Sequence, residues 1–442
     1  MKYNNINEER VHVLDAETNV WSVIKDIATL DQEDAFYVCD IGDIVRKHKI
    51  WKATLPRVIP HYAVKCNDSL TVLEVLAELG TSFDCASKAE IIKVMSLGVD
   101  AKRIIFANPA KMKSHIKYAA EVGVHTMTFD NELELEKVKL YHPDAKMVIR
   151  IRCDAAEAQC PLGMKFGCDP VTEAPALLRK AKSLGVNVIG VSFHVGSGCR
   201  EPAVFSRAIA ASKGVFEVAQ SIGFQFNLLD IGGGYPGGKY SSIDEIANII
   251  NNALDHYFPD PEIQVIAEPG RFYVSSAYTL ACNIHSIRNV SSISSTGEVV
   301  DRRMYYINDG VYGSFNCILY DHQVVVPKTL KEYDTPLYMS SIWGPTCDGL
   351  DQVVEQILLP DMKEGDWLVF EDMGAYTLPV ASPFNGFPIP RVHVVAHKNI
   401  LMLFKDLMPL TDEHFDMGTI PYLNCNCLMK VGVDFTFNPM SN

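Results

Sequence analysis

Two glycine-containing segments stand directly after acidic residues at the ends of apolar runs. Asp230 precedes the triple glycine 232–234, and Glu268 precedes a Pro-Gly pair and Arg271. Glycines let backbone N–H groups approach a phosphate closely, and an arginine adds a charge-assisted hydrogen bond. A tight turn would also use three glycines, so one such segment is weak evidence. Two consecutive segments of this kind favour a phosphate-binding site.

Lys65 is a further candidate functional residue, because it is a cation within the apolar run HYAVKC (61–66). A salt-bridged lysine at the end of a strand would explain it equally well. A desolvated lysine has a lowered pKa and can form a Schiff base with a carbonyl group. Together with a phosphate site it suggests pyridoxal 5′-phosphate, which needs a lysine, a phosphate cup and a group opposite its pyridine nitrogen. Glu268 is the candidate for that group. His194, in SFHVGSG, is the candidate for stacking on the ring, although a buried histidine more often only satisfies a hydrogen bond.

A second group of polar residues lies later in the chain, with Tyr320 and Asp321 in NCILYDH and Cys347 and Asp348 in WGPTCDGLD. A neighbouring carboxylate raises the pKa of a thiol, so Cys347 is better suited to giving a proton than to acting as a thiolate. The two carboxylates suit a substrate ammonium group. We expect no metal site, because no CxxC or histidine pair has the spacing of zinc ligands.

The elements that must position these residues alternate between short strands and amphipathic helices. Eight strand-like runs begin with HYAVKC and end with VIAE (265–268), and helix-like segments separate them. This number predicts a (β/α)₈ barrel, in which active sites lie at the carboxyl ends of the strands. An open, doubly wound sheet would use the same units. We prefer the barrel because the count is eight and because the candidate residues all follow strands.

The pattern changes after Glu268, where alternating strand-like runs separated by Gly and Pro turns replace the periodic helices. We therefore expect the barrel over residues 36–275 and a mostly antiparallel β domain over 276–404, joined by the N-terminal segment 1–35. The polar, Ser-rich stretch 288–302 is predicted to be a loop. Residues 405–442 show no clear period and are predicted to be a loosely attached tail.

Composition excludes several classes of function. The chain has 40 Lys and Arg against 54 Asp and Glu, a formal net charge of −14, which argues against binding nucleic acid or an anionic membrane. No apolar run reaches the ~18 residues of a membrane span. The N-terminal segment lacks the apolar core of a signal peptide. The 12 cysteines lie mostly in apolar runs and are expected to be reduced thiols, so we expect a cytoplasmic enzyme.

Over about residues 10–400 the chain resembles the ornithine decarboxylase family, a barrel class of pyridoxal-phosphate decarboxylases. The motifs that carry the resemblance are PHYAVKCND, FDCASKAE, SFHVGSGC, LDIGGGYPG, AEPGRFYV, NDGVYGSFNCILYDH, SSIWGPTCDGLD and EDMGAYT. The resemblance implies decarboxylation of L-ornithine to putrescine and CO₂, the entry step of polyamine biosynthesis. It also implies a head-to-tail homodimer with active sites shared across the interface.

The resemblance assigns roles residue by residue. Lys65 would form the Schiff base, Glu268 would pair with the pyridine nitrogen and His194 would stack on the ring. The phosphate would be held by Ser197, Gly232, Gly233, Gly234, Arg271 and Tyr376. Asp84, Glu90 and Arg150 would surround Lys65. From the partner subunit, Cys347 would reprotonate the substrate, and Asp348, with Tyr320 and Asp321, would bind the distal ammonium. Tyr235 departs from the family's usual Phe.

Two other functions remain open from the sequence. One is a non-catalytic antizyme inhibitor, a paralogue that resembles the enzyme but loses site residues; here the residues of the site are present. The other is a decarboxylase that prefers lysine or arginine. Antizyme is also a candidate partner of this chain, through a basic helical stretch with Lys111, Lys113, Lys117, Lys137 and Lys139. Solvated helix faces have the same pattern, so this surface is only a hypothesis.

Overall fold

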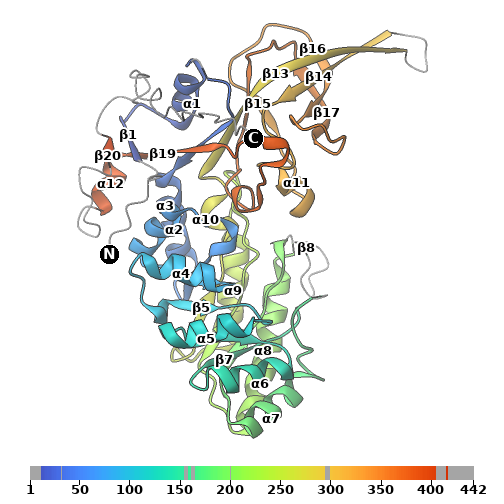
Figure 1. Cartoon of the computed structure of the whole chain (residues 1–442). Helices are drawn as coiled ribbons and strands as arrows, with labels where there is room; N and C mark the ends of the chain where they lie inside the picture. The colour runs from blue at the N-terminus through green and yellow to red at the C-terminus, as the bar shows by residue number, and fades with distance from the viewer. Residues whose placement is uncertain are drawn as a thin grey trace, which may run out of the picture.

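The computed structural model describes residues 11–30, 32–153, 158–160, 165–199, 201–293, 299–404 and 415–416. Figure 1 shows a barrel of strands and helices in the lower part of the view and a large β-sheet above it. In the described part of the chain, no helix is both long and apolar enough to cross a membrane.

Eight parallel strands form a closed barrel in the order of the sequence. They are β3 (Val58–Ala63), β4 (Ser82–Cys85), β5 (Ile104–Phe106), β6 (Thr126–Phe129), β7 (Lys146–Arg150), β9 (Asn187–Ser192), β11 (Leu228–Asp230) and β12 (Gln264–Ala267). Val265 of β12 lies opposite Val58 of β3, and this pairing closes the barrel. The predicted barrel is confirmed. The doubly wound alternative is excluded, because an open sheet would leave two edge strands without this pairing.

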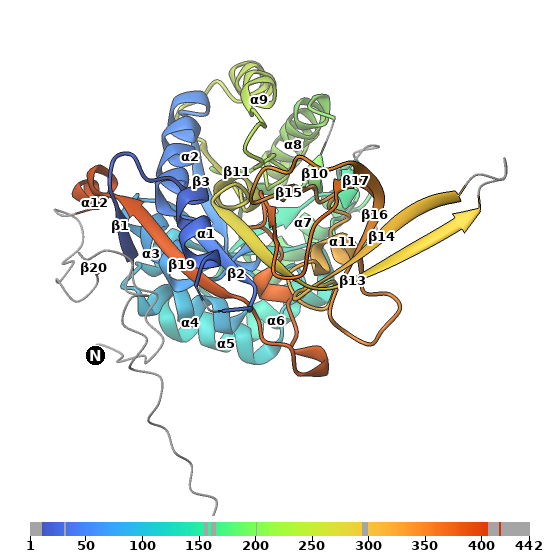
Figure 2. The same cartoon turned by 90° about the horizontal axis from the view of Figure 1, so that it is seen from above.

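Helices surround the barrel strands, as the view from above in Figure 2 shows. They are α2 (Ile41–Thr54), α3 (Leu70–Glu78), α4 (Lys88–Ser96), α5 (Lys113–Val122), α6 (Glu132–Tyr141), α7 (Ala174–Leu184), α8 (Ala203–Ile222) and α9 (Asp244–Tyr257). Gly123, Gly185 and Gly223 end α5, α7 and α8 in the left-handed conformation. Glycine is well suited to these C-cap positions, since it enters this conformation without steric cost.

The hydrophobic core has two parts around the barrel wall. The larger part lies between the strands and the helices and extends into the second sheet. The smaller part fills the inside of the barrel with Ile105, Val148, Leu228 and Ile266, none of which is more than 5% exposed. This inner apolar layer also lines a cavity of about 460 Å³ that opens among residues at the N-terminal ends of the strands. Polar side chains inside the barrel are therefore divided between its two ends.

The second sheet is mixed and is built around β13. Its strands are β1 (Val11–Leu14), β2 (Phe36–Asp40), β13 (Tyr278–Ile293), β14 (Val299–Ile307), β15 (Pro327–Thr329), β16 (Leu337–Trp343), β17 (Gln352–Pro360), β18 (Trp367–Phe370), β19 (Arg391–His397) and β20 (Phe415–Asp416). β13 pairs in antiparallel fashion with β2, β14 and β18. β1, β2 and β19 pair in parallel, and so do β14 and β16.

The remaining elements connect or cover these two parts. Helix α1 (Val20–Ala28) packs Val23, Ile24 and Ile27 against the sheet. Short helices are α10 (Arg271–Val274), α11 (Asn316–Tyr320) and α12 (Lys398–Phe404), and a two-stranded ribbon joins β8 (Ala158–Cys160) to β10 (Ser197–Cys199). Single 3₁₀ turns cover Val64–Cys66, Ala101–Arg103, Leu378–Val380 and Phe384–Gly386.

Long-range pairing differs from the local pattern in two places. Residues 36–40, which the sequence places at the start of the barrel, form β2 and lie between β13 and β19 in the second sheet. The predicted loop at 288–302 is mostly a β-hairpin, because Arg288 to Ile293 pair with Val299 to Met304. Figure 2 shows this hairpin of β13 and β14 reaching away from the barrel. Most of the predicted tail, 405–442, lies outside the described residues, and Phe415–Asp416 pairs with β1.

Candidate active site

Lys65 lies at the carboxyl end of β3, in the 3₁₀ turn Val64–Cys66. Its ammonium forms an ion pair with Asp84, the buried residue near the end of the neighbouring strand β4. Desolvation lowers the pKa of Lys65, but the carboxylates of Asp84 and Glu268 outweigh it, so the net shift of this pKa is upward. The second oxygen of Asp84 is buried and has no hydrogen-bond partner among the described residues.

Glu90 supports this pair from the next helix. Its carboxylate accepts a hydrogen bond of 2.6 Å from the backbone N–H of Ala86, two residues after Asp84. Its own N–H donates to Ser87, the N-cap of α4. Burial raises the pKa of Glu90. In the described part of the chain Glu90 makes no hydrogen bond to Lys65, so it acts on Lys65 through the backbone that carries Asp84.

Three more charged groups lie at the carboxyl ends of barrel strands at the same mouth. Arg150 ends β7, Asp230 ends β11 and Glu268 follows β12, and each is at most 9% exposed. No role was predicted for Asp230 from the sequence, although it stands beside the triple glycine. Its carboxylate is fully buried and accepts a hydrogen bond of 2.9 Å from the N–H of Gly232. The position of this acid just before the glycine loop was the feature of the sequence that could have marked it as a functional residue.

The glycine loop after β11 has no room for side chains. A Cβ on Gly232 would lie 2.1 Å from the carbonyl oxygen of Phe193, and one on Gly233 would lie 2.8 Å from Nε2 of His194. Gly232 and Gly234 also have φ angles of +63° and +117°, which other residues rarely adopt. The sequence therefore needs glycine here for backbone conformation and for close packing against His194.

Arg271 connects this loop region to three other segments. Its Nη2 donates to Ser197 Oγ at 3.1 Å and forms an ion pair with Asp321, while Tyr376 lies under the guanidinium at 5.2 Å. Its Nε is buried and has no hydrogen-bond partner among the described residues. Tyr376 is held by its N–H, which donates to the carbonyl of Cys66, and its φ is +55°. Arg271 thus retains a donor for an anion.

His194 is a neutral ring beside these groups. Burial, and then the positive charges of Arg150 and Lys65, hold the pKa of His194 well below its ordinary value. Its Nδ1 accepts a hydrogen bond of 2.9 Å from the N–H of Gly196. A neutral, flat and fixed ring is suited to stacking against an aromatic cofactor.

Of the second group of polar residues predicted from the sequence, the structure places only Asp321 in contact with the barrel mouth. Asp321 is only 5% exposed and joins the barrel mouth through Arg271. Tyr320 is 68% exposed, and Cys347 is exposed with its N–H donating to Asn385 Oδ1. Asp348 accepts a hydrogen bond from the hydroxyl of Tyr312. Within the described residues, Cys347 and Asp348 make no hydrogen bond or ion pair with the barrel.

The residues at the barrel mouth fit pyridoxal phosphate. A lysine, a glycine loop with Ser197 and Arg271, a buried acid and a neutral imidazole converge there, and both Asp84 Oδ1 and Arg271 Nε have unused hydrogen-bonding capacity among the described residues. This combination defines a class of barrel enzymes that hold a phosphorylated aldehyde on a lysine. No group of three metal-ligating side chains is placed to hold a metal ion in the described part of the chain.

Comparison with known proteins gives the family. Residues 41–275 match the family model described as pyridoxal-dependent decarboxylase, pyridoxal binding domain. The chain is 49% identical to the ornithine decarboxylase of Mus musculus over 441 residues, 96% of this chain and 95% of that protein. It is 52% identical to antizyme inhibitor 2 of Xenopus laevis over 379 residues, 84% and 83% of the two chains. The chain therefore belongs to the pyridoxal-dependent decarboxylase family, in the branch that contains ornithine decarboxylases and an antizyme inhibitor.

Solved structures agree with this assignment. The arginine decarboxylase of Paramecium bursaria Chlorella virus, bound to agmatine, has a TM-score of 0.79 and 37% identity, and covers 85% of this chain and 100% of its own. The lysine/ornithine decarboxylase of Vibrio vulnificus, complexed with putrescine, has a TM-score of 0.75 and 32% identity, and covers 86% and 99%. Barrel and sheet are thus shared with decarboxylases that act on three different basic amino acids.

Proposed function

We propose that this chain is a pyridoxal-phosphate-dependent decarboxylase that converts L-ornithine to putrescine and CO₂, the entry step of polyamine biosynthesis. The observation that carries the proposal is the Lys65–Asp84 ion pair at a barrel mouth that also holds a glycine loop and Arg271. The near full-length similarity to curated ornithine decarboxylases supports the substrate. The direct test is product analysis with ornithine, lysine and arginine offered in competition. Putrescine should dominate, and a majority of cadaverine or agmatine would contradict the proposal.

Bound at this mouth, pyridoxal phosphate supplies an electron sink for the electron pair that the departing carboxylate leaves. Lys65 would hold the cofactor covalently, and Asp84 would keep the lysine ammonium in place once it is released. Ser197, Gly232, Gly233, Gly234, Arg271 and Tyr376 would hold the phosphate. Glu268 would face the ring nitrogen and His194 the face of the ring. Arg150 would balance the negative charge of Asp84 and Glu268.

Substrate length would be set by carboxylates that face the distal ammonium, Asp321 and Asp348, beside Tyr320. Asp321 already pairs with Arg271, so its position is fixed relative to the phosphate site. The carboxylate of Asp348 accepts hydrogen bonds from the Leu350 N–H and the Tyr312 hydroxyl, which lower its pKa. Lysine is longer by one methylene, a difference worth only about 1–3 kcal/mol in a pocket of this kind. Slow turnover of lysine is therefore expected.

We also propose that the active enzyme is a homodimer whose sites combine Lys65 of one subunit with Cys347 and Asp348 of the other. Exposed apolar side chains near Cys347 support this. Leu350 is 70% exposed, and Phe384, which packs 4.4 Å from the ring of Tyr312, is 42% exposed. Cys347 would return a proton to the substrate carbon, so Cys347→Ala should release CO₂ but give some misprotonated product.

Mixing inactive variants tests the shared site. With putrescine formation as the measured activity, Lys65→Ala and Cys347→Ala homodimers should each be strongly impaired, because the first lacks the cofactor lysine and the second misplaces the proton after CO₂ release. After subunit exchange, half the dimers would be mixed, each with one intact site, so roughly a quarter of wild-type activity should return. If exchange is demonstrated, for example by mass spectrometry of differently tagged subunits, and no activity returns, each site is built within one chain.

A non-catalytic role is the second candidate function, because an antizyme inhibitor is among the relatives of this chain. The presence of Lys65, Asp84 and Glu268 at one mouth argues for the enzyme. The absorption spectrum of the purified chain separates the two functions, since a binding paralogue has no need of lysine-bound cofactor. Absence of such a cofactor after incubation with pyridoxal phosphate would favour the inhibitor.

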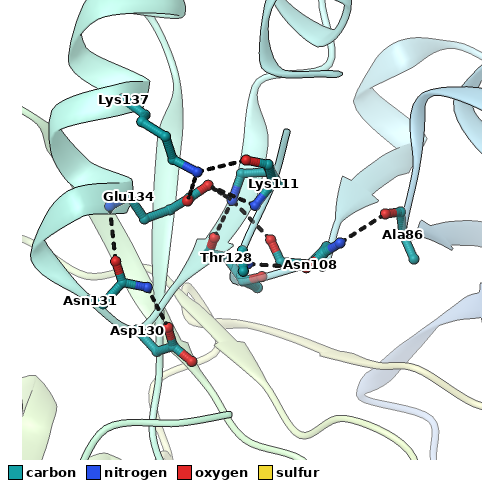
Figure 3. Close-up of polar contacts among 9 residues, drawn as sticks. Ala86, Asn108, Lys111, Thr128, Asp130, Asn131, Glu134 and Lys137 are labelled. Carbon is teal, nitrogen blue, oxygen red and sulfur yellow. Dashed lines mark hydrogen bonds and ion pairs between the residues drawn. The ribbon is translucent and has the colours of Figure 1, made fainter. Parts of the chain in front are cut away.

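Antizyme itself is proposed as a partner through α5 and α6, and the structure corrects the composition of this surface. Lys111 is 2% exposed, and Figure 3 shows it directed at Glu134 and Thr128 inside the protein. Lys111 is buried in an ion pair with Glu134, so it is not part of the candidate surface. Lys137 pairs with the other oxygen of Glu134. Lys113 and Lys117 lie over the ring of Tyr141.

Two further proposals concern the location of the protein in the cell and the roles of its two domains. We propose a cytoplasmic location, because most cysteines lie in apolar runs typical of reduced thiols, and fractionation of cells that express the tagged chain would test it. We also propose that the cofactor domain is the barrel, close to the 41–275 matched by the family model, and that the β domain supplies Cys347 and Asp348. Neither nucleic acid nor a membrane is proposed as a partner.

A further inference from the structure

Lys47 is a buried lysine of helix α2 that has no role in the site described so far. It is only 2% exposed. Its Nζ donates to the carbonyl of Gly237 at 2.9 Å and to the carbonyl of Gly238 at 3.4 Å. Among the described residues Lys47 forms no ion pair, so backbone carbonyls are the acceptors that satisfy its buried ammonium group.

The two carbonyls belong to the far end of the glycine loop. Gly237 and Gly238 follow the triple glycine 232–234 in the segment after β11. A Cβ on Gly237 would lie 2.0 Å from the carbonyl oxygen of Arg271, so the loop packs directly against the backbone that carries this arginine. Lys47 therefore binds the glycine loop at the point where it meets the second segment of the proposed phosphate site.

The same face of α2 also contacts that second segment. Nζ of Lys47 lies 5.2 Å from the ring centre of Phe272, the residue after Arg271. Trp51, one turn further along α2, is fully buried, and its ring lies 5.4 Å from that of Phe272 and 4.8 Å from that of Tyr235 in the glycine loop. Residues four apart lie on one face of a helix. One face of α2 thus touches both segments.

The residue after the two glycines connects the loop to a third segment of the proposed phosphate site. The N–H of Lys239 donates to Oδ1 of Asp372 at 2.8 Å. Asp372 lies four residues before Tyr376, which is proposed to hold the phosphate. Lys47 is therefore bound at the junction of the segments that carry the triple glycine, Arg271 and Tyr376.

Hydrogen bonds from Lys47 fix this junction more strictly than the ring contacts do, because they are directional. A peptide unit is planar, so a donor that holds two successive carbonyls also fixes two successive peptide planes. A loop that is fixed before its ligand arrives loses less conformational freedom on binding, and its affinity is higher for that reason.

We propose that Lys47 is a positioning residue that holds the glycine loop against Arg271 and thereby sets the affinity of this site for the phosphate group of the cofactor. It acts through the backbone of Gly237 and Gly238. The proposal rests on the cofactor part of the proposed function and not on the identity of the amino acid substrate.

The first test separates phosphate recognition from cofactor binding in general. Lys47→Met keeps the unbranched side chain but removes the donor of both carbonyls. In titrations followed by the absorbance of the lysine-bound cofactor, this variant should bind pyridoxal 5′-phosphate about tenfold more weakly than the wild type. Its affinity for pyridoxal, which lacks the phosphate, should be nearly unchanged. Equal weakening for both compounds, or wild-type affinity for pyridoxal phosphate, would overturn the proposal.

Lys111→Met is the matched control variant. Lys111 is also 2% exposed and donates to a backbone carbonyl, that of Thr128 at 2.6 Å, but it lies between α5 and α6 and pairs with Glu134. This variant should keep the wild-type preference for pyridoxal phosphate over pyridoxal. A loss of preference equal to that in Lys47→Met would show that any buried lysine has this effect, and would contradict a specific role of Lys47.

Hydrogen exchange of the wild type provides a test that does not depend on the folding of a variant. The N–H groups of Gly232 and Lys239 are bonded to side chains, so the peptide 231–241 reports on the glycine loop. If Lys47 fixes the loop in advance, this peptide should be protected in the cofactor-free chain, and added pyridoxal phosphate should slow its exchange only slightly. Protection that appears only after the cofactor is added would overturn the proposal.

Failure of the proposed function would be recognised separately. A wild-type chain that binds no pyridoxal phosphate would contradict the cofactor assignment and this proposal together. A wild-type chain that binds it on Lys65, with the same affinity in Lys47→Met, would contradict the role of Lys47 alone. Ornithine enters none of these measurements, so a wrong amino acid substrate would leave their outcome unaltered.

Discussion

The two ends of the barrel both contain polar side chains, but only one end brings them together. At the carboxyl end, Lys65 pairs with Asp84, and Arg271 binds both Ser197 and Asp321. At the N-terminal end, a cavity of about 460 Å³ is lined by His61, Lys102, His125, Lys146 and amide side chains, with no carboxylate in its lining. The inner apolar layer with Ile105, Leu228 and Ile266 lies between the two ends.

The difference shows what turns polar residues into a site. At the carboxyl end the loops after the strands add a glycine cradle and charges of both signs, and Asp84 Oδ1 and Arg271 Nε keep unused hydrogen-bonding capacity among the described residues. At the N-terminal end His61 is buried beside its own strand, and its ring contacts only the carbonyl of Ile59 at 3.4 Å. Burial, with a smaller contribution from the charge of Arg103, lowers the pKa of His61 to about 4. The first end is therefore expected to govern activity and the second to govern stability.

The largest effect should come from Lys65. Lys65→Ala should reduce the rate of ornithine decarboxylation by about 10³-fold or more, the loss that follows removal of a covalent nucleophile. Borohydride reduction and peptide mapping should place the pyridoxyl label of the wild type on Lys65 and find none in the variant. The label on another lysine would move the site away from this mouth and break the comparison.

Glu268→Gln should have the next largest effect. The neutral amide cannot stabilise a positive charge on the ring, so the rate of CO₂ release should fall by about 10²–10³-fold, as for other fixed electrostatic groups. Binding of pyridoxal phosphate, measured by fluorescence titration, should change much less than the rate. A rate equal to that of the wild type would remove Glu268 from the mechanism.

A matched pair of cations compares the two ends directly. Arg271→Ala removes a charge-assisted hydrogen bond and should weaken binding of pyridoxal phosphate by about 10- to 100-fold. Lys146→Ala removes a cation from the cavity at the other end and should leave the affinity unchanged. The ratio of dissociation constants of the two variants measures how far function is confined to the carboxyl end.

His61 gives the smallest effect, on stability alone. Its pKa in the folded protein is about 4 and that of an unfolded histidine is about 6.5, so below pH 6.5 the unfolded chain binds a proton that the folded chain does not. Stability should therefore fall as pH falls, by about 1 kcal/mol between pH 6.5 and 5.5 from this residue. The pH dependence of urea unfolding should be shallower by that amount in His61→Gln. The exposed His256→Gln should keep the wild-type slope.

Much of the cofactor site was predictable because it depends on short segments. Eight strand–helix units, the glycine loop at 232–234 and Lys65 at a strand end are all local patterns, and the closed barrel places their strand ends at one mouth. Asp230 stood out as an acid before the glycine loop, but no role was predicted for it. The structure shows that backbone hydrogen bonds through Gly232 bring the chain at Asp230 beside Glu268, 38 residues later in the sequence.

By itself, the sequence determined the elements, the barrel and the chemical types at the strand ends, because strand and helix periods and glycine caps are read over a few residues. Only the tertiary structure decided which surfaces meet. β2 was taken into the second sheet by pairing with β13 and β19, and part of 288–302 became a strand because its partner strand was available. Lys111 was buried against Glu134, which removed it from a basic surface that composition had suggested. Pairing and burial depend on residues distant in the chain, and no local pattern contains them.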